Sequence, residues 1–331
     1  MSSNVTVVGG GAMGTACAWV LAQNRLRNVR MWARNPTFAR HIEETRENSR
    51  LLPGIRLPEN VRVMSDSATA FASAEAIVVC VPTRGLRDAF TELKSYIPES
   101  AVLVSAVKGI ENSTLERPSQ ILQQVLGTRP VVALGGPCHA EEVARRKPAS
   151  VVAACDQPEV AEYVQNLLST DFLRVYANSD LTGVEFAGAL KNVIAIAAGI
   201  CDGLDYGDNA RSALLTRGLA EMVRFGISFG TQPETFYGLA GVGDLTATCC
   251  SRHSRNRAVG EMLGRGMTLS QIQQSMNAVA EGIFTAKSVV EIAQQNGIDM
   301  PIARAVYEVL FENKNPAEAT QQLMRRPLRA E

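Results

Sequence analysis

Short apolar runs alternate with helical patterns through the first half of the chain. Several runs are continuous rather than alternating, which is typical of strands buried on both faces of a parallel sheet. The runs that we predict as strands are residues 5–8, 28–33, 76–81, 101–107, 131–134, 150–154 and 173–177. Repeated strand–helix alternation predicts an α/β domain with an open, doubly wound parallel sheet.

The pattern changes near Asp180, after which we find helical periodicity and loops but no convincing strand. The helices that we predict there are residues 182–199, 209–229, 256–263, 270–276, 284–295, 302–311 and 316–324. We therefore expect two domains, an α/β domain over residues 1–179 and an all-α domain over residues 180–331. The cleft between two such domains is where we expect a substrate to bind.

A glycine-rich turn follows the first predicted strand and precedes a helix. Gly9, Gly11 and Gly14 fit the spacing G-x-G-x-x-G. In a Rossmann-type domain the first glycine permits the turn, the second lets the backbone approach a pyrophosphate, and the third lets helix and strand pack closely. The pyrophosphate then lies at the helix N-terminus. The pattern indicates a dinucleotide site, although a plain strand-to-helix turn would also contain glycines.

The residue after the second predicted strand bears on the choice of dinucleotide. An acidic residue near this point accepts hydrogen bonds from the adenosine ribose, but the sequence reads Trp32-Ala33-Arg34-Asn35. An arginine suits the 2′-phosphate of NADP instead. Arg34 therefore favours NADP over NAD, with an ordinary surface arginine as the alternative.

Composition narrows the class of function. The 331 residues carry no formal net charge, so the electrostatic footprint of a nucleic-acid-binding protein is missing. The seven cysteines are scattered and show no metal-binding spacing, and we expect no metal site. Free thiols fit a reducing, cytoplasmic setting. We expect no signal peptide, and the longest apolar run, residues 193–201, is too short to span a bilayer.

Two lysines are candidates for chemistry. Lys191 lies in a helical pattern with no charged residue three or four positions away, so it either extends to water or is desolvated within a site. Desolvation favours loss of a lysine's proton, which suits proton transfer near neutral pH. Lys108 follows a predicted strand at the sheet edge where ligands bind. For both, a solvated surface lysine is the alternative.

Two polar segments of the second half complete the candidates. The glycine-rich segment 238–244 follows no strand and indicates a tight loop that presents Asp244, whose alternative role is a helix N-cap. Residues 251–257 combine serines, an asparagine and three arginines, a composition suited to a phosphate cradle. A solvated basic loop is the alternative for that segment.

These motifs, taken together, resemble the bacterial type of NAD(P)-dependent glycerol-3-phosphate dehydrogenases over almost the whole chain. The segments that carry the resemblance are Gly9-Gly-Gly-Ala-Met-Gly14, Val107-Lys108-Gly109, Gly136-Pro137-Cys138-His139-Ala140, Leu190-Lys191-Asn192-Val193-Ile194, Asn209-Ala-Arg-Ser-Ala-Leu214, Gly241-Val-Gly-Asp244-Leu-Thr246, Ser254-Arg255-Asn256-Arg257 and Val279-Ala-Glu281-Gly282. Each segment alone is modest, and their order makes the set specific.

The resemblance implies a fold, a reaction and roles for residues. The fold is a Rossmann-type sheet followed by a helical domain, like that of 6-phosphogluconate dehydrogenase. The reaction is reversible hydride transfer between NAD(P)H and dihydroxyacetone phosphate, giving sn-glycerol 3-phosphate for phospholipid synthesis. Lys191 is then the proton donor and acceptor. The implied substrate-binding residues are Lys108, Gly136, Cys138, Lys191, Asp244, Ser254, Arg255 and Asn256. The implied cofactor-binding residues are Gly9, Gly11, Ala12, Met13, Gly14, Arg34, Lys108, Ala140, Arg255, Val279 and Glu281.

The chain departs from the family in the loop after Gly136-Pro137. Serine or threonine is usual next, but here Cys138 is followed by His139, which puts a hydroxyl contact to substrate in doubt. Two rival functions stay open at this point. One is a β-hydroxyacid dehydrogenase, and the other is a non-catalytic NADP sensor. We expect a small-molecule substrate as the partner, no nucleic acid, and a homodimer as the assembly.

Overall fold

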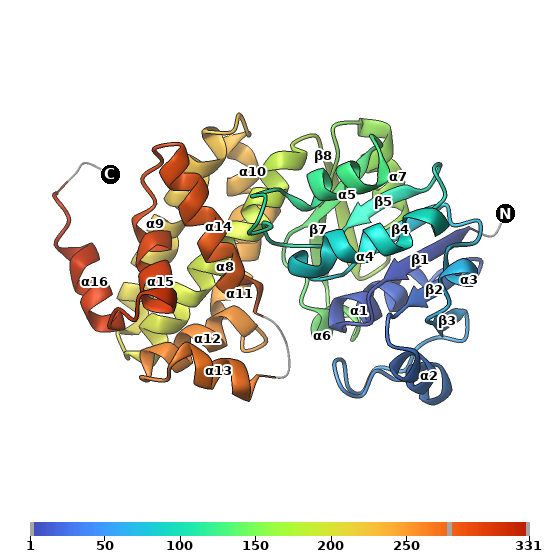
Figure 1. The fold of residues 1–331 in the computed structure, drawn as a ribbon, viewed down its shortest axis with the longest axis horizontal. Helices are drawn as coiled ribbons and strands as arrows, with labels where there is room; N and C mark the ends of the chain where they lie inside the picture. Colours follow the sequence, from blue (N-terminus) through green and yellow to red (C-terminus); the bar gives the residue numbers. More distant parts are fainter. Residues whose placement is uncertain (1–2, 277–279, 329–331) are drawn as a thin grey trace. The chain divides into compact units, whose positions relative to one another are not determined.

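The computed structural model describes residues 3–276 and 280–328. They form two compact units (Figure 1). The first comprises Met1–Lys108 and Arg117–Val184, and the second comprises Gly109–Glu116 and Glu185–Glu331. The predicted domain boundary did not anticipate that residues 109–116 belong to the second unit. Ser288 explains the association, because its hydroxyl bonds Asn112 Oδ1 at 2.6 Å within the second unit.

The first unit is built on one eight-stranded sheet with the strand order β3-β2-β1-β4-β5-β6-β7-β8. The strands are β1 Asn4–Val8, β2 Asn28–Trp32, β3 Val61–Met64, β4 Ala76–Val79, β5 Val102–Ser105, β6 Val131–Gly135, β7 Ala149–Ala154 and β8 Leu173–Asn178. The doubly wound, mainly parallel sheet confirms the predicted fold class. We missed β3, a short edge strand in which only Val61 and Val63 are buried.

One strand pair departs from the expected parallel arrangement. β6 and β7 are antiparallel, with Ala133 opposite Ala154, whereas every other pair among the described strands is parallel. A parallel neighbour needs a full helical crossover, but an antiparallel one does not. The connection from β6 to β7 holds only the four-residue helix α6, Ala140–Val143, so the chain reverses direction there.

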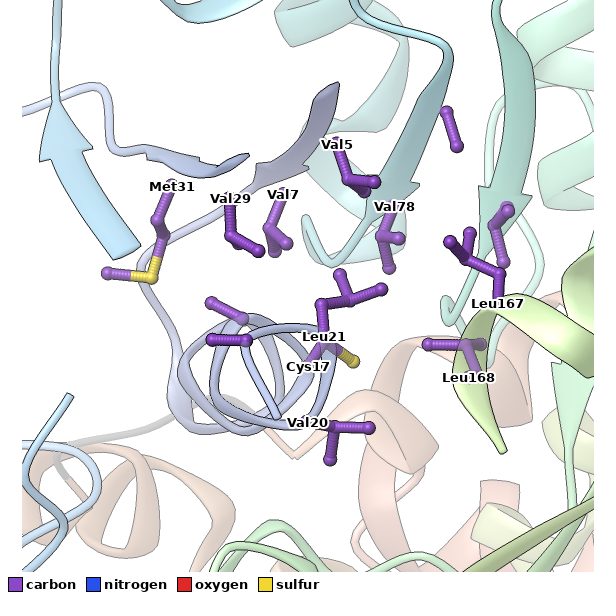
Figure 2. Packing of buried hydrophobic residues seen from close by; sticks show 14 of the residues in the cluster. Val5, Val7, Cys17, Val20, Leu21, Val29, Met31, Val78, Leu167 and Leu168 are labelled. Atoms are coloured by element: carbon purple, nitrogen blue, oxygen red, sulfur yellow. The ribbon is translucent and has the colours of Figure 1, made fainter. Parts of the chain in front are cut away.

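Helices cover both faces of this sheet. They are α1 Ala12–Leu21, α2 Pro36–Thr45, α3 Ser67–Phe71, the 3₁₀ turn η1 Thr83–Gly85, α4 Leu86–Leu93, the 3₁₀ turn η2 Lys94–Tyr96, α5 Pro118–Leu126, α6 and α7 Pro158–Leu168. Val78 packs on the α1 face, while Ile77 and Val79 pack on the opposite face with α4 and α5. Figure 2 shows Val5, Val7 and Val78 directed at Leu21 and Cys17 of α1. Burial on both faces explains the continuous apolar runs.

The second unit is helical throughout its described residues. Its elements are α8 Leu181–Gly203, α9 Gly207–Ile227, α10 Pro233–Tyr237, the π-helical turn η3 Leu239–Gly243, α11 Asp244–Cys250, α12 Arg255–Gly264, α13 Leu269–Ser275, α14 Glu281–Gln295, α15 Pro301–Phe311 and α16 Pro316–Met324. α8, which begins in the first unit, has 23 residues and is the one helix of the described chain long and apolar enough to cross a membrane. The apolar run at residues 193–201, identified in the sequence, is only part of this helix. All of its most apolar window is buried, as in a core helix.

Glycines let α12 pack directly on α8. A methyl group at Gly199 would overlap the carbonyl oxygen of Arg257, and one at Gly260 would overlap that of Ile196. One turn further on, Gly203 and Gly264 meet in the same way. Two glycine pairs spaced by four residues therefore bring the two backbones into contact, and this places the start of α12 beside the middle of α8.

Candidate active site

The glycine-rich turn of the first unit has the geometry that a dinucleotide requires. Gly9 has φ +119°, and a methyl group on it would meet the carbonyl oxygen of Cys80 at 2.8 Å. A methyl group on Gly14 would overlap the carbonyl oxygen of Gly9, so the helix can approach the strand only with glycine there. At Gly11 the corresponding space is open, so a ligand can approach the backbone. These residues fit a bound pyrophosphate, and α1 begins directly after them with Ala12 and Met13.

Arg34 lies two residues beyond Trp32, the end of β2, close to where the sequence predicts a selector of the ribose. Its side chain is 59% exposed and pairs at 3.7 Å with Glu92 on α4, which is also exposed. An exposed ion pair of this kind contributes little free energy. Redirecting the guanidinium toward a 2′-phosphate therefore costs little.

Lys108 and the loop after β6 meet at one edge of the sheet. β5 and β6 are parallel neighbours, so their carboxyl ends lie together. Lys108 Nζ donates to the carbonyl oxygen of Gly136 at 3.0 Å and lies 3.6 Å from Cys138 Sγ. The Cys138 thiol donates to the same carbonyl at 3.2 Å. Ala140, just beyond, is buried against Ala16 of α1 and has a packing role.

Lys191 and Asp244 form a buried pair in the second unit. Lys191 Nζ lies 2.6 Å from Asp244 Oδ1 and 2.6 Å from Thr248 Oγ1. The side chains of the two charged residues are 8% and 3% exposed. Of the two alternatives for Lys191, the structure shows the desolvated one, with its charge balanced by a carboxylate from another helix. Asp244 is the first residue of α11 and follows a π-helical turn, which corrects both the expected loop and the alternative N-cap.

Asn256 connects three helices beside this pair. Its amide nitrogen donates to Asn192 Oδ1 at 2.9 Å, and its oxygen accepts from the backbone N–H of Gly282 at 2.9 Å. A methyl group on Gly282 would meet the carbonyl oxygen of Asn192 at 2.6 Å, so glycine is needed at the start of α14. Asn192 is the residue after Lys191, and Asn256 thus ties α12 and α14 to the segment of α8 that carries the lysine.

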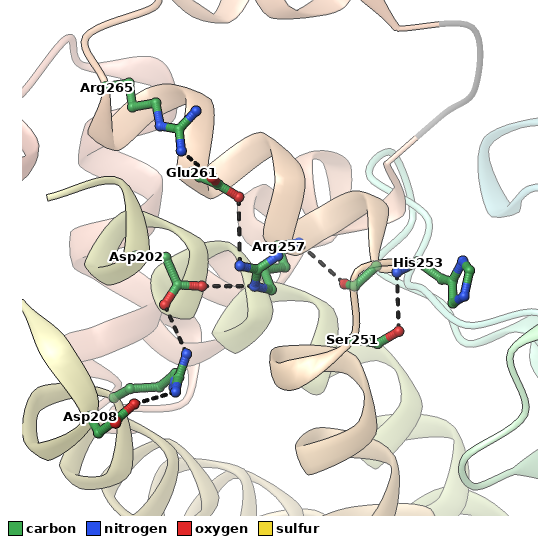
Figure 3. A network of polar contacts seen from close by, with 9 residues as sticks. Asp202, Asp208, Ser251, His253, Arg257, Glu261 and Arg265 are labelled. Atoms are coloured by element: carbon green, nitrogen blue, oxygen red, sulfur yellow. Dashed lines mark hydrogen bonds and ion pairs between the residues drawn. The ribbon is translucent and has the colours of Figure 1, made fainter. Parts of the chain in front are cut away.

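The segment 251–257 is divided between capping, structural and exposed side chains. Ser254 is the N-cap of α12 and accepts from the Arg257 N–H at 3.2 Å. Arg257 itself bonds Asp202 at 2.7 Å and lies near Glu261 (Figure 3). Arg255 is exposed at the first position of the helix. Arg257, which the sequence suggested as part of a phosphate cradle, therefore holds α12 on α8 instead.

One further predicted cofactor residue lies at the start of α14. Glu281 is its first residue, and Val279 lies outside the described residues. The structure therefore brings together Lys191 with Asp244, Asn256 with Gly282, and Lys108 with Gly136 and Cys138. The first two groups lie in the second unit and the third lies in the first unit.

Residues other than the predicted ones take part in these contacts. Asn192 and Thr248 were not assigned roles from the sequence. Thr248 is four residues after Asp244, so a predicted helix there would have placed the two on one face. Burial raises the pKa of the Cys249 thiol to about 12, which disfavours its nucleophilic thiolate near neutral pH. Among the described residues no cluster of three or more His, Cys, Asp or Glu could hold a metal ion.

Both halves of the chain match models of one known protein family. Residues 4–161 match the family described as "NAD-dependent glycerol-3-phosphate dehydrogenase N-terminus", and residues 180–321 match the corresponding C-terminus. The chain belongs to the NAD-dependent glycerol-3-phosphate dehydrogenase family. The resemblance drawn from the motifs is thus confirmed.

Individual members of the family are similar over nearly their whole length. A glycerol-3-phosphate dehydrogenase [NAD(P)+] of Chlorobium phaeobacteroides is 46% identical over 325 residues, covering 97% of each chain. One of Geobacillus thermodenitrificans is 46% identical and covers 98% of this chain and 95% of its own. The solved structure of a glycerol-3-phosphate dehydrogenase from Coxiella burnetii superposes with a TM-score of 0.94 at 34% identity, over 98% of this chain and 99% of its own.

Proposed function

We propose that this protein catalyses reversible hydride transfer between NAD(P)H and dihydroxyacetone phosphate, giving sn-glycerol 3-phosphate for phospholipid synthesis. Family membership supports the reaction, and the buried Lys191–Asp244 pair is the observation that carries the mechanism. A desolvated cation with a fixed partner suits a reaction in which negative charge develops on a carbonyl oxygen. It has no evident use in a protein that only senses a nucleotide.

Lys191 supplies the proton of the reduction. The nicotinamide, when bound, supplies the hydride. As charge grows on the substrate oxygen, the Lys191 ammonium stabilises it and donates a proton, and it recovers that proton in the reverse direction. Asp244 and Thr248 hold Nζ at 2.6 Å each, so the ammonium is oriented before the substrate arrives. Asp244 also balances the charge of the lysine within this buried site.

The phosphate group of the substrate anchors it remotely from the reacting carbon. We assign this role to Arg255, Ser254 and Asn256 at the start of α12, where a guanidinium, a capping hydroxyl and helix N–H groups lie close in the chain. Lys108, with the backbone at Gly136 and Cys138, provides a further cationic contact to substrate and cofactor. Binding energy at the phosphate then orients the carbonyl.

The dinucleotide is held by the turn from Gly9 to Gly14, with Ala12 and Met13 acting through the backbone. Arg34 supports a preference for NADP. Ala140 contributes by packing, and we keep Arg255, Glu281 and Val279 as contacts predicted from the family pattern.

Steady-state kinetics test this function against its rivals. Purified protein should oxidise NADPH, and NADH less efficiently, only when dihydroxyacetone phosphate is added. A panel of 2-keto and 3-keto acids should give no turnover. Turnover with a keto acid but not with dihydroxyacetone phosphate would support the β-hydroxyacid dehydrogenase, and cofactor binding without any turnover would support the sensor.

A pair of arginine variants tests the phosphate site. Arg255→Ala should raise KM for dihydroxyacetone phosphate at least about tenfold, because a charge-assisted bond is lost. Arg252→Ala removes a nearby exposed arginine that has no assigned role and should leave KM within about twofold. Equal effects of the two variants would remove Arg255 from the site.

The assembly and location follow as further proposals. We propose a homodimer, supported by the exposed apolar side chains of Ile227 and Tyr237, which are 52% and 60% exposed. Light scattering after size exclusion measures the mass directly. We propose a cytoplasmic location, supported by seven free cysteines.

A further inference from the structure

Asn48 lies beneath the glycine-rich turn, although the sequence separates the two by nearly forty residues. It belongs to the irregular segment between α2 and β3 and is fully buried. Its side-chain nitrogen donates to the carbonyl oxygen of Gly10 at 3.0 Å and to Thr15 Oγ1 at 2.8 Å. One amide therefore contacts both the turn and the first full turn of α1.

Thr15 extends this network to the next peptide group. It is also fully buried, and its hydroxyl accepts from Asn48 while donating to the carbonyl oxygen of Gly11 at 2.9 Å. The Thr15 N–H donates to the same carbonyl. The carbonyls of two successive residues are thus both held on the protein side of the turn.

Because peptide bonds are planar, the direction of these two carbonyls also fixes the direction of the N–H groups that follow them. None of the described peptide bonds is cis, so each carbonyl and the N–H of the following residue point in opposite directions. With the Gly10 carbonyl held by Asn48, the Gly11 N–H points away from Asn48. With the Gly11 carbonyl held by Thr15, the Ala12 N–H points away from Thr15. These are the N–H groups at the start of α1, where an anion binds.

The segment that carries Asn48 is also held by a backbone hydrogen bond and by apolar packing. The carbonyl oxygen of Asn48 accepts from the Leu52 N–H at 2.8 Å. Leu52 and Ile55 are buried in a small apolar cluster with Ala16 of α1 and Ala140 of α6. This packing holds the segment against α1, so that the Asn48 amide stays within reach of Gly10 and Thr15.

We propose that Asn48 is a positioning residue for the dinucleotide. Through Gly10 and Thr15 it aims the N–H groups of Gly11 and Ala12 at the pyrophosphate and so sets cofactor affinity. The proposal rests on the proposed function of the turn as a cofactor site. It explains a buried polar side chain that no motif in the sequence indicated.

Direct cofactor binding tests the proposal without reference to turnover. Both tryptophans, Trp19 and Trp32, lie in the first unit, so energy transfer from tryptophan to NADPH reports the dissociation constant. Asn48→Ala should raise this constant at least about tenfold, while KM for dihydroxyacetone phosphate at saturating NADPH stays within about twofold. Thermal unfolding of each protein is measured alongside.

A second asparagine provides the matched control. Asn60 is in the same unit, and its side chain also donates to backbone carbonyls, those of Ala22, Asn24 and Arg27, away from the turn. Asn60→Ala should lower thermal stability but leave the NADPH constant within about twofold of wild type. A rise for Asn60→Ala equal to that for Asn48→Ala would overturn the proposal, because the effect would then be general destabilisation.

A milder substitution keeps the test decisive if Asn48→Ala does not fold. Thr15→Val retains the shape and removes the hydroxyl that links Asn48 to Gly11, so it should weaken NADPH binding about fivefold. Wild-type affinity in Thr15→Val, or in a folded Asn48→Ala, would contradict the proposal. If wild-type protein itself fails to bind NADPH, the proposed function fails instead, so the two failures are distinct.

Discussion

The ammonium of Lys191 on α8 lies 2.6 Å from the carboxylate of Asp244 on α11, with both side chains almost fully buried. Because both ions are largely withdrawn from water, each stabilises the other, and loss of one partner removes much of the balance of charge at this point in the protein. The pair is retained at a cost in desolvation, which is typical of groups used in catalysis rather than for stability.

Asp244→Asn should impair both catalysis and folding. The amide cannot balance the lysine charge, so the free energy of unfolding should fall by about 3 kcal/mol and kcat by about a hundredfold or more. Asp202→Asn is the matched control, since Asp202 pairs with Arg257 in the same unit but outside the proposed chemistry. That variant should lose stability with kcat nearly unchanged. An equal loss of kcat in both variants would make the role of Asp244 purely structural.

Arg34→Asp should shift the preference from NADPH toward NADH. A carboxylate after β2 repels the 2′-phosphate and accepts hydrogen bonds from the ribose hydroxyls. The measurement is the ratio of kcat/KM for the two cofactors, which should change at least about tenfold. Glu92→Gln removes only the partner of Arg34 and should leave NADPH preferred. A ratio that stays constant in Arg34→Asp would show that another residue selects the cofactor.

Glu221 makes the stability of the second unit depend on pH. It is buried on α9, and its two oxygens accept from the backbone N–H groups of Ile302 and Ala303 at the start of α15, at 2.6 and 3.2 Å. Burial raises its pKa to about 7, although the two amide bonds and Arg224 act in the opposite direction. Between its usual pKa of 4.5 and pH 7 the folded state keeps a proton that the unfolded state has lost. The contribution to stability is therefore full below pH 4.5 and is lost as the pH rises to about 7.

Glu221→Gln should remove this pH dependence. Glutamine offers one acceptor oxygen to two amides, so it carries a constant penalty at every pH. The stability advantage of wild type over the variant should shrink by about 3 kcal/mol between pH 4.5 and 7.5, as measured by urea unfolding. Parallel stability profiles for the two proteins would show that Glu221 does not titrate in this range.

Gly260→Ala should separate α12 from α8. The added methyl group would overlap the backbone carbonyl of Ile196, which cannot rotate away, so we expect a loss of about 3 kcal/mol in urea unfolding. Gly218→Ala on α9 is the control, because its methyl group would meet the Ile194 side chain at 2.7 Å, and a side chain can move. That variant should lose about 1 kcal/mol or less. Equal losses would mean that the α8–α12 crossing tolerates a wider spacing.

Local patterns predicted most of the first unit. The buried strands were visible as continuous apolar runs, and Lys108 could be placed at the sheet edge because it follows one of them. The antiparallel direction of β7 could not be predicted, because no local pattern shows which way the chain turns in the short connection through α6. The edge strand β3 was missed because only two of its side chains are buried.

Contacts between distant residues account for what the sequence did not reveal in the site. Lys191 was a candidate because of its apolar surroundings, but its pairing with Asp244, 53 positions away, depends on how α11 packs on α8. The support of the glycine turn by Asn48 is similar, since an asparagine in an irregular segment carries no pattern. The resemblance to a known family indicated the glycine turn, Lys191 and Asp244, but it did not show the contacts that these residues make.

The most direct test of the account is Lys191→Met, which replaces the ammonium with an apolar side chain of similar length. Turnover of dihydroxyacetone phosphate with NADPH should fall by at least about a thousandfold, because the proton donor and its charge are both lost. Binding of NADPH, measured by energy transfer from tryptophan, should stay within about threefold of wild type. Turnover within tenfold of wild type in the folded variant would contradict the assignment of Lys191 as the acid that completes hydride transfer.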